Sequence, residues 1–362
     1  MSVDIDITGL PTERIRFSPS PLAELGAMLH ALSEPGHHPG LHPWATATAS
    51  SLKPDLADRL TEADFLWRSS RSEILLPAVP RATLAEELDD LDRMDDETFT
   101  SAAFEITCTT GYERGLPSPL VDAEQRARVR ELSAARGPRQ AEFTDRMLEN
   151  PRALRAWLRR LLEDCEQAFF GDNWQRVRVQ LAADARHKAD LLQRKGLAEA
   201  LAAVSPAVSL SAGEDQTRIV VDKLASGRTT AYGQGVTFLP TAFGWPHLFV
   251  VHRSGWQPVI QYPVAGTELP QLTAPQLVQE RLEALAHPVR MRLCRTLARG
   301  PHTTGELAAA YGLTPPEVSR HIAVLKKAGL LTTRRRGRYV LHQLDLTLVA
   351  RLGSDFLETV LR

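Results

Sequence analysis

Cysteine is scarce in this chain, and long apolar runs are absent. Of the 362 residues only Cys108, Cys165 and Cys294 are cysteine, and they lie far apart. An odd number of scattered cysteines argues against a disulfide framework and fits a reducing compartment. No apolar run approaches the ~18 residues that a membrane helix needs, and residues 1–11 lack the basic and apolar regions of a signal peptide. We therefore expect a cytoplasmic protein without a membrane partner.

Catalytic signatures are also missing from the sequence. It contains no nucleophile elbow, phosphate-binding loop, dinucleotide fingerprint or zinc-protease motif. With 43% hydrophobic and 24% charged residues, the composition is that of an ordinary globular protein. The sequence therefore predicts a protein that is not an enzyme and that needs no cofactor.

What the chain has instead is an uneven distribution of charge. Residues 275–362 hold 14 Lys and Arg against 7 Asp and Glu, so this segment is at +7. The preceding residues hold 29 basic and 37 acidic side chains and are at −8, although the formal net charge of the whole chain is only −1. A compact basic module joined to an acidic body is typical of a nucleic-acid-binding protein with a separate effector domain.

Hydrophobic periodicity predicts an α+β fold, in which residues 1–265 form a mostly helical domain with a small antiparallel sheet. Helical patterns fill residues 18–205, and β-branched and aromatic residues gather in residues 215–263. Ser20-Pro21 and Asn150-Pro151 are typical helix starts. We further expect a strand at 15–17, a loop at 36–54, a linker at 263–275, helices at 55–67, 81–94, 175–194 and from 196, and strands at 217–221, 230–239, 247–252 and 257–262.

Residues 275–362 show the dense pattern of a winged helix-turn-helix domain. Two helices, separated at residues 287–288, precede two capping boxes, each of which pairs a threonine with a glutamate three residues later. These boxes, at Thr303 and Thr314, start two further helices, and a two-stranded hairpin follows Gly329. This order of elements predicts a compact module with one helix free to enter a groove.

The fourth helix and the hairpin carry the candidate DNA-binding residues. Val318, Ile322 and Leu325 recur at helical spacing and are expected to face the core, which leaves polar side chains on the outer face. Such a helix can read a major groove, while arginines at the hairpin tip suit phosphate contact. The candidates are Thr314, Glu317, Ser319, Arg320, His321, Lys326, Lys327, Arg334, Arg335, Arg336 and Arg338. A purely structural or protein-binding helix-turn-helix is the alternative, and for Glu317 we favour a capping role.

These motifs resemble the ArsR/SmtB family of winged-helix regulators. The likeness covers residues 282–344 and rests on LAHPVRMRL, on GELAAAYGLTPPEVSRHIAVLKKAGLL and on a basic wing that ends in Tyr339. It implies a homodimeric repressor that binds a double-stranded DNA operator. The stretch LPTAFGWPHLFVVHRSGWQPVIQYPVAG makes the preceding domain similar to an uncharacterised domain of actinobacterial regulators. That domain would be the effector or interaction domain, with an unidentified small molecule or protein as its partner.

Two other functions stay open at this point. One is a non-enzymatic interaction scaffold that uses the winged helix for dimerisation. The other is an enzyme in the N-terminal domain with a regulatory winged helix. Seven aromatic residues bear on the second alternative, because they could line a ligand pocket. Such a set more often forms the core of a sheet, which we favour. The set comprises Tyr232, Phe238, Phe243, Trp245, Phe249, Trp256 and Tyr262.

The sequence departs from the metal-sensing members of the family it resembles. Those members carry a Cys-x-Cys pair before the recognition helix, or Asp and His ligands on the last helix. Here residues 302–307 contain no cysteine and residues 346–362 contain no histidine. His37, His38 and His42 lie in a Pro- and Gly-rich stretch, where we expect an ordered surface loop rather than a zinc site. The sequence therefore predicts no metal.

The end of the chain carries an apolar stripe that predicts a dimer. Its residues recur at spacings of three and four over about four helical turns. Because the winged-helix core is already filled by other residues, the stripe needs a partner surface, which we expect to be a second copy of the chain. The alternative is packing on the acidic N-terminal domain. The stripe consists of Leu346, Val349, Leu352, Phe356, Leu357 and Val360.

Overall fold

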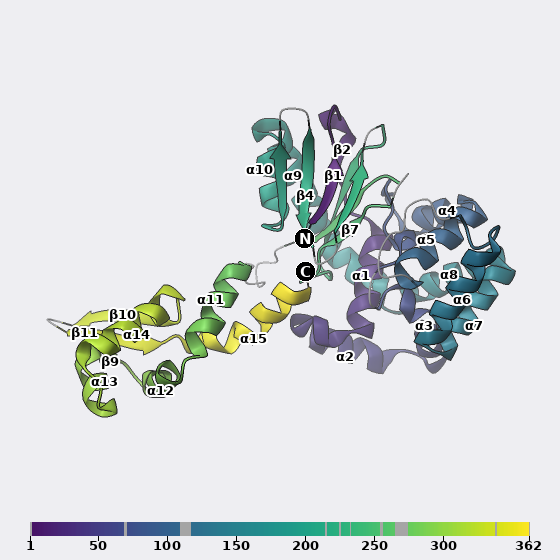
Figure 1. The fold of residues 1–362 in the computed structure, drawn as a ribbon. Coiled ribbons are helices and arrows are strands. Elements are labelled where there is room, and N and C mark those ends of the chain that lie inside the picture. The colour runs from purple at the N-terminus through teal and green to yellow at the C-terminus, as the bar shows by residue number, and fades with distance from the viewer. Residues whose placement is uncertain are drawn as a thin grey trace. The chain divides into compact units, whose positions relative to one another are not determined.

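The computed structural model divides the chain into two compact units, Met1–Leu269 and Pro270–Leu361. Figure 1 shows helices and strands in both, so the expected mixed α+β composition is confirmed. Each unit has its own apolar core. The residues that the structure describes are 2–68, 71–108, 117–213, 216–223, 226–231, 233–253, 256–264, 274–336 and 339–361.

Helices make up the first part of the first unit. Helix α1 (Pro21–Ser33) begins where the Ser20 hydroxyl accepts a hydrogen bond from the Ala23 amide, and its Leu25 and Met28 are fully buried. The helices that follow are α2 (His42–Ser51), α3 (Pro54–Ala63), α4 (Leu84–Arg93), α5 (Asp96–Cys108), α6 (Ala123–Arg136), α7 (Pro138–Glu149) and α8 (Pro151–Cys165). The predicted start of α8 is confirmed, because the Asn150 side chain caps it.

The loop expected at residues 36–54 is wrong, because α2 occupies its second half. Proline in the first turn is compatible with a helix start. The sequence HPWATATASS of α2 nevertheless has few large apolar residues, so its periodicity is weak. Helices α5, α6 and α7 lie within the stretch 18–205 that was expected to be helical, although the pattern predicted no individual helix there.

Two four-stranded sheets complete the first unit, so the prediction of one small antiparallel sheet is wrong. One sheet has the strand order β3-β4-β1-β5 and the other β2-β6-β8-β7. Strand β1 pairs antiparallel with β4 but parallel with β5, and β6 is parallel to both β2 and β8. The strands are β1 (Ser2–Asp6), β2 (Ile15–Phe17), β3 (Val208–Ala212), β4 (Thr217–Asp222), β5 (Gly227–Thr230), β6 (Val236–Thr241), β7 (Phe249–Val251) and β8 (Val259–Pro263).

The strand predicted at 230–239 is divided into β5 and β6 by a glycine turn. Gly233 and Gly235 both have positive φ, which side chains rarely adopt. A Cβ at Gly235 would also collide with the carbonyl oxygen of Arg14, just before β2. The turn therefore lets β6 lie next to β2, a strand from the beginning of the chain.

Helix α9 (Gly171–Lys195) joins the helical core to the sheet core, and α10 (Leu197–Val204) follows it along the sheet (Figure 1). Trp174 and Val177 contact both cores, while Leu181 and Leu192 belong to the sheet core. Phe238 and Tyr262 are fully buried in the same core, which supports the core interpretation of the aromatic set. Tyr232 of that set lies outside the described residues.

The second unit has the helices and the hairpin that the sequence predicts. Leu293, Leu307, Val318, Ile322 and Leu325 are buried in its core. The two-residue strand β9 was missed, because so short a segment has no period. The elements are α11 (Pro275–Leu285), α12 (Pro288–Leu297), β9 (His302–Thr303), α13 (Thr304–Tyr311), α14 (Pro315–Lys327), β10 (Leu331–Arg336), β11 (Tyr339–Leu344) and α15 (Leu346–Leu361). In the described parts of both units, no helix has the length and apolarity to cross a membrane.

Candidate nucleic-acid interface

A short turn connects α13 to α14. At its beginning, α13 has the predicted capping box. The Glu306 carboxylate accepts a hydrogen bond from the Thr303 amide at 2.7 Å, and the Glu306 amide donates one to the Thr303 hydroxyl at 3.2 Å. The helix ends at Gly312, whose φ of 64° is left-handed and favours glycine. Thr314 already precedes the first residue of α14, so the two helices are joined by a connection with little freedom.

Glu317 stabilises the start of α14. One oxygen of its carboxylate accepts both the amide and the hydroxyl of Thr314, each at 2.8 Å. These hydrogen bonds, the backbone one first, hold the pKa of Glu317 below its ordinary value. These hydrogen bonds hold the carboxylate at the start of the helix, which supports the capping role.

The outer face of α14 is exposed and basic. Val318, Ile322 and Leu325 point into the core, and Ser319, Arg320 and Lys326 are exposed. Two of the predicted residues have protein partners instead. Lys327 forms an exposed ion pair with Glu280 of α11 at 3.4 Å. The half-buried His321 lies 5.0 Å from His287 between ring centroids, and burial, then His287, lower the pKa of His321.

Sequence reasoning missed one residue of this face. Val324 is 41% exposed and follows Arg320 by four positions, so the two side chains are neighbours on the helix surface. A branched apolar side chain there can contact the methyl group of thymine, as apolar side chains do in major grooves. The spacing from Arg320 was the available signal, but apolar residues were assigned to the core.

The wing is a hairpin whose base is buried and whose outer part is basic. Leu331 pairs with Leu344, and both are buried, while Arg334, Arg335 and Arg336 are exposed. Because side chains alternate along a strand, Arg334 and Arg336 lie on one face of the ribbon and Arg335 on the other. Arg338 lies outside the described residues. The structure therefore places exposed arginines on both faces of this ribbon.

Within the second unit, a buried ion pair and apolar contacts hold helix α15 against the other helices. Asp355 is 2% exposed and accepts from Arg281 of α11 at 2.8 Å and from Arg351 at 3.3 Å. The predicted stripe is only partly used: Val349 packs on the core, but Phe356 is 43% exposed. Leu346 and Val360 are also exposed, and Leu352 and Leu357 are half-buried.

The described part of the second unit brings no three His, Cys, Asp or Glu side chains together as a metal site. Cys294 is 6% exposed and belongs to the apolar core, and burial raises the pKa of its thiol. The histidines of the first unit are different. Of the three histidines of the expected surface loop, His38 is fully buried and His37 half-buried, so that expectation is wrong, and only the third, His42, is exposed.

Comparison with known families covers both units. The model of a family described as "Family of unknown function (DUF5937)" matches residues 1–268 of the 362. The chain belongs to the DUF5937 family. A second model, described as a helix-turn-helix domain, matches residues 285–334 of this DUF5937 protein, from the end of α11 into β10.

Known regulators are similar to about a fifth of the chain. The "Biofilm growth-associated repressor" of Agrobacterium fabrum is 39% identical over 71 residues, 20% of this DUF5937 chain and 61% of that repressor. The "HTH-type transcriptional regulator Rv2034" of Mycobacterium tuberculosis is 41% identical over 73 residues, 20% and 68% of the two chains. The chain thus spans less than two thirds of the first of these relatives. Together with the family model, they identify the C-terminal unit as an ArsR-family helix-turn-helix domain.

A solved structure also aligns with a part of the DUF5937 protein. The crystal structure of the transcriptional repressor BigR from Xylella fastidiosa is 32% identical, with a TM-score of 0.20. The alignment covers 24% of this chain and 88% of that chain.

Proposed function

We propose that this DUF5937 protein is a sequence-specific DNA-binding transcription regulator that acts as a repressor. The observation that carries the proposal is the exposed basic face of α14 in the same unit as the exposed arginines of β10. Both features lie in the ArsR-family domain, and repressors are among its named relatives. The opposite face of α14 is buried in the core, and Ser319, Arg320 and Lys326 on the basic face are exposed.

In this proposal α14 enters the major groove of an operator. Arg320 donates to guanine, Ser319 and Val324 contact neighbouring base edges, and Lys326 reaches phosphate. The remaining candidates contact the backbone or hold the helix in place. These are Thr314, Glu317, His321 and Lys327 around α14, and Arg334, Arg335, Arg336 and Arg338 on the wing.

We further propose that the protein acts as a cytoplasmic homodimer, with residues 275–362 as the DNA-binding domain and residues 1–265 as the effector or interaction domain. The exposed part of the α15 stripe supports self-association, and a two-fold dimer would match two half-sites about one DNA turn apart. The ligand or protein to which the first domain responds would set the affinity for the operator.

The test begins by selecting bound fragments from random duplex DNA with the full chain. Arg320→Ala should then lose about 1–3 kcal/mol of preference for the selected operator over unrelated DNA. Replacing both Arg334 and Arg336 by Ala should instead weaken binding to all sequences. It should also flatten the slope of log K against log salt by roughly 0.9 for each lost phosphate contact.

The matched control is Arg194→Ala, which removes the same charge from an exposed position at the end of α9. It should leave affinity, sequence preference and salt slope as in the wild type. Selection that enriches no sequence, or an Arg320→Ala variant with unchanged preference, would contradict the proposed function. Fluorescence anisotropy at several salt concentrations measures all three quantities.

A further inference from the structure

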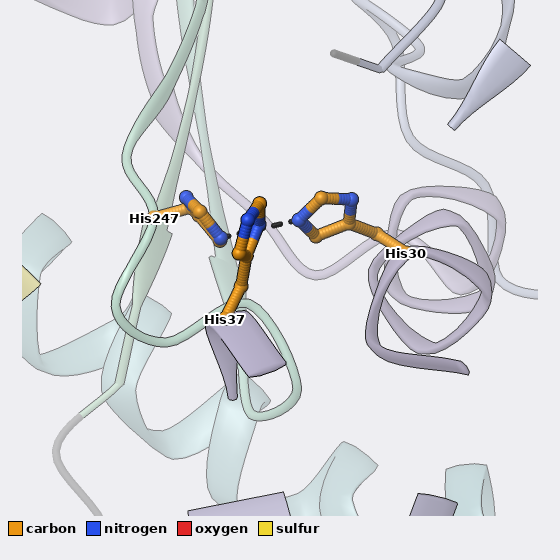
Figure 2. Close-up of side chains that lie close together, drawn as sticks. All are labelled: His30, His37 and His247. Atoms are coloured by element: carbon orange, nitrogen blue, oxygen red, sulfur yellow. Dashed lines mark hydrogen bonds between the residues drawn. The ribbon is translucent and has the colours of Figure 1, made fainter. Parts of the chain in front are cut away.

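Three histidines from distant parts of the first unit converge in its interior. His30 lies in α1, His37 ends the 3-10 turn Pro35–His37, and His247 lies between β6 and β7. One ring nitrogen from each can be chosen so that all lie within 4.8 Å of one another. Figure 2 shows the three imidazole rings gathered around a common point. His30 and His247 are 1% and 7% exposed, so this point is shielded from solvent.

Hydrogen bonding fixes the tautomer of His30 and leaves its lone pair on the nitrogen that faces the other rings. His30 Nδ1 lies 2.7 Å from the Trp67 carbonyl oxygen, which can only accept, so Nδ1 carries the proton. The lone pair of His30 is therefore on Nε2, where it accepts a hydrogen bond from His247 Nε2 at 3.1 Å. A bound ion would take the place of the proton in this hydrogen bond. A metal-bound histidine almost always donates its other N–H to a carbonyl or carboxylate in this way. The Trp67 carbonyl is thus already in the place of the group that accepts from a metal-bound histidine.

Buried nitrogens without partners surround the same point. His37 Nδ1 and His38 Nε2 are both buried and have no hydrogen-bond partner. His38 donates from Nδ1 to the Trp245 carbonyl at 2.5 Å, and its ring centroid is 5.0 Å from those of His30 and His247. Leaving a buried polar atom unpaired costs about 1–3 kcal/mol, so each such atom needs an explanation. A bound cation would explain why these two nitrogens have no hydrogen-bond partner.

We propose that His30, His37 and His247 bind one divalent first-row transition-metal ion, with Zn²⁺ as the best match. Imidazole nitrogen suits Zn, Cu, Ni and Fe, whereas Mg²⁺ and Ca²⁺ require oxygen ligands. Three protein ligands leave a fourth position of a tetrahedral site for His38 Nε2 or a small molecule. The ion would connect α1 and the turn after it to the β6–β7 loop.

The charge around this site is compatible with a cation. Two cations are adverse charges. The buried Arg71 guanidinium lies over the ring of Phe249, which itself contacts His30, and the Lys223 ammonium lies 5.9 Å from the centre of the same ring. Two carboxylates, Glu24 and Glu73, are buried in the same region at 1% and 2% exposure, and the charge of Glu24 favours the charged form of Arg71.

The experiment uses the full, untagged chain after removal of metal with a chelator. Dialysis against Zn²⁺ followed by elemental analysis should find one Zn²⁺ per chain, and titration with Co²⁺ should produce the visible absorption of nitrogen-ligated Co²⁺. His37→Ala should weaken binding by more than the 10–100-fold that the loss of an outer partner costs. Because His37 is half-buried, this variant disturbs the packing least. His247→Gln is the second variant.

His42→Ala is the matched control, since His42 is exposed five positions after His37. It should retain the full Zn²⁺ content. A wild-type protein that binds neither Zn²⁺ nor Co²⁺ would overturn the proposal, as would variants at His37 and His247 that bind like the wild type. Equal loss in His42→Ala would show binding by surface histidines and overturn it too. No DNA is present, so failure here is distinguishable from failure of the proposed function.

Discussion

Replacing Phe356 by lysine should convert dimers of this chain into monomers. The Phe356 side chain is 43% exposed on α15, between the exposed Leu346 and Val360 of the same stripe. Leu282 on the neighbouring helix α11 is 40% exposed as well. Lysine is preferred to aspartate because the adjacent Asp355 is a buried carboxylate whose ion pair with Arg281 has to be preserved.

The size of the effect follows from the exposed fractions. Full burial of a Leu, Val or Phe side chain stabilises by roughly 1.5–3 kcal/mol. About half of each of these side chains is still exposed in one chain, so covering it adds about 1 kcal/mol per residue. Four residues in two symmetric copies then contribute roughly 8 kcal/mol toward the cost of association. Losing Phe356 from both copies removes about 2 kcal/mol, a weakening of roughly 30-fold before the buried charge is counted.

Sedimentation velocity across the micromolar range is the assay. We expect a wild-type dimer, a Phe356→Lys monomer, and circular dichroism spectra that show both to be folded. Met291→Lys is the control, because Met291 is 50% exposed but lies on α12, outside the stripe. The reasoning is refuted if the wild type is already monomeric, or if Phe356→Lys sediments like the wild type at every concentration.

Two further predictions concern stability. Leu325→Ala leaves a cavity at a fully buried position in the core of the second unit, and it should lower the free energy of unfolding of that unit by about 2–5 kcal/mol. Denaturant titration measures this loss, and a value below about 1 kcal/mol would contradict the packing described. Burial raises the pKa of Glu87 to about 7, so folded protein binds its proton more tightly than unfolded protein does. The stabilising contribution of Glu87 is therefore complete below pH ~4.5 and is lost as the pH rises through ~7. Glu87→Gln should remove this part of the pH dependence of Tm. Identical profiles of Tm against pH in the wild type and the variant would argue against this role of Glu87.

The sequence predicts the second unit well because its signals are local. A capping box at Thr303, a left-handed glycine at Gly312 and an arginine hairpin each depend on residues within a few positions. The sheets of the first unit could not be predicted in this way. Strands β1 and β2 pair with segments more than 200 residues later, and no pattern along the chain reports such pairing.

The same distinction applies to the candidate sites. The outer face of α14 follows from helical spacing, so Ser319 and Arg320 can be assigned to it from the order of residues alone. The ion pair of Lys327 with Glu280 cannot, because it joins two helices. The histidine cluster depends still more on tertiary structure: His30 and His247 are 217 positions apart, and only His37 stands out in the sequence.

The pairing of β1 also bears on how the chain folds during synthesis. Strand β1 lies inside its sheet, between β4 and β5, and its Val3 and Ile5 are buried there. A ribosome that adds about 5–20 residues per second needs roughly 10–40 s to deliver those partner strands after β1 has emerged. Helices α1 to α8 are complete well before then. The helical core therefore forms while Val3 and Ile5 of β1 still lack the strands that bury them.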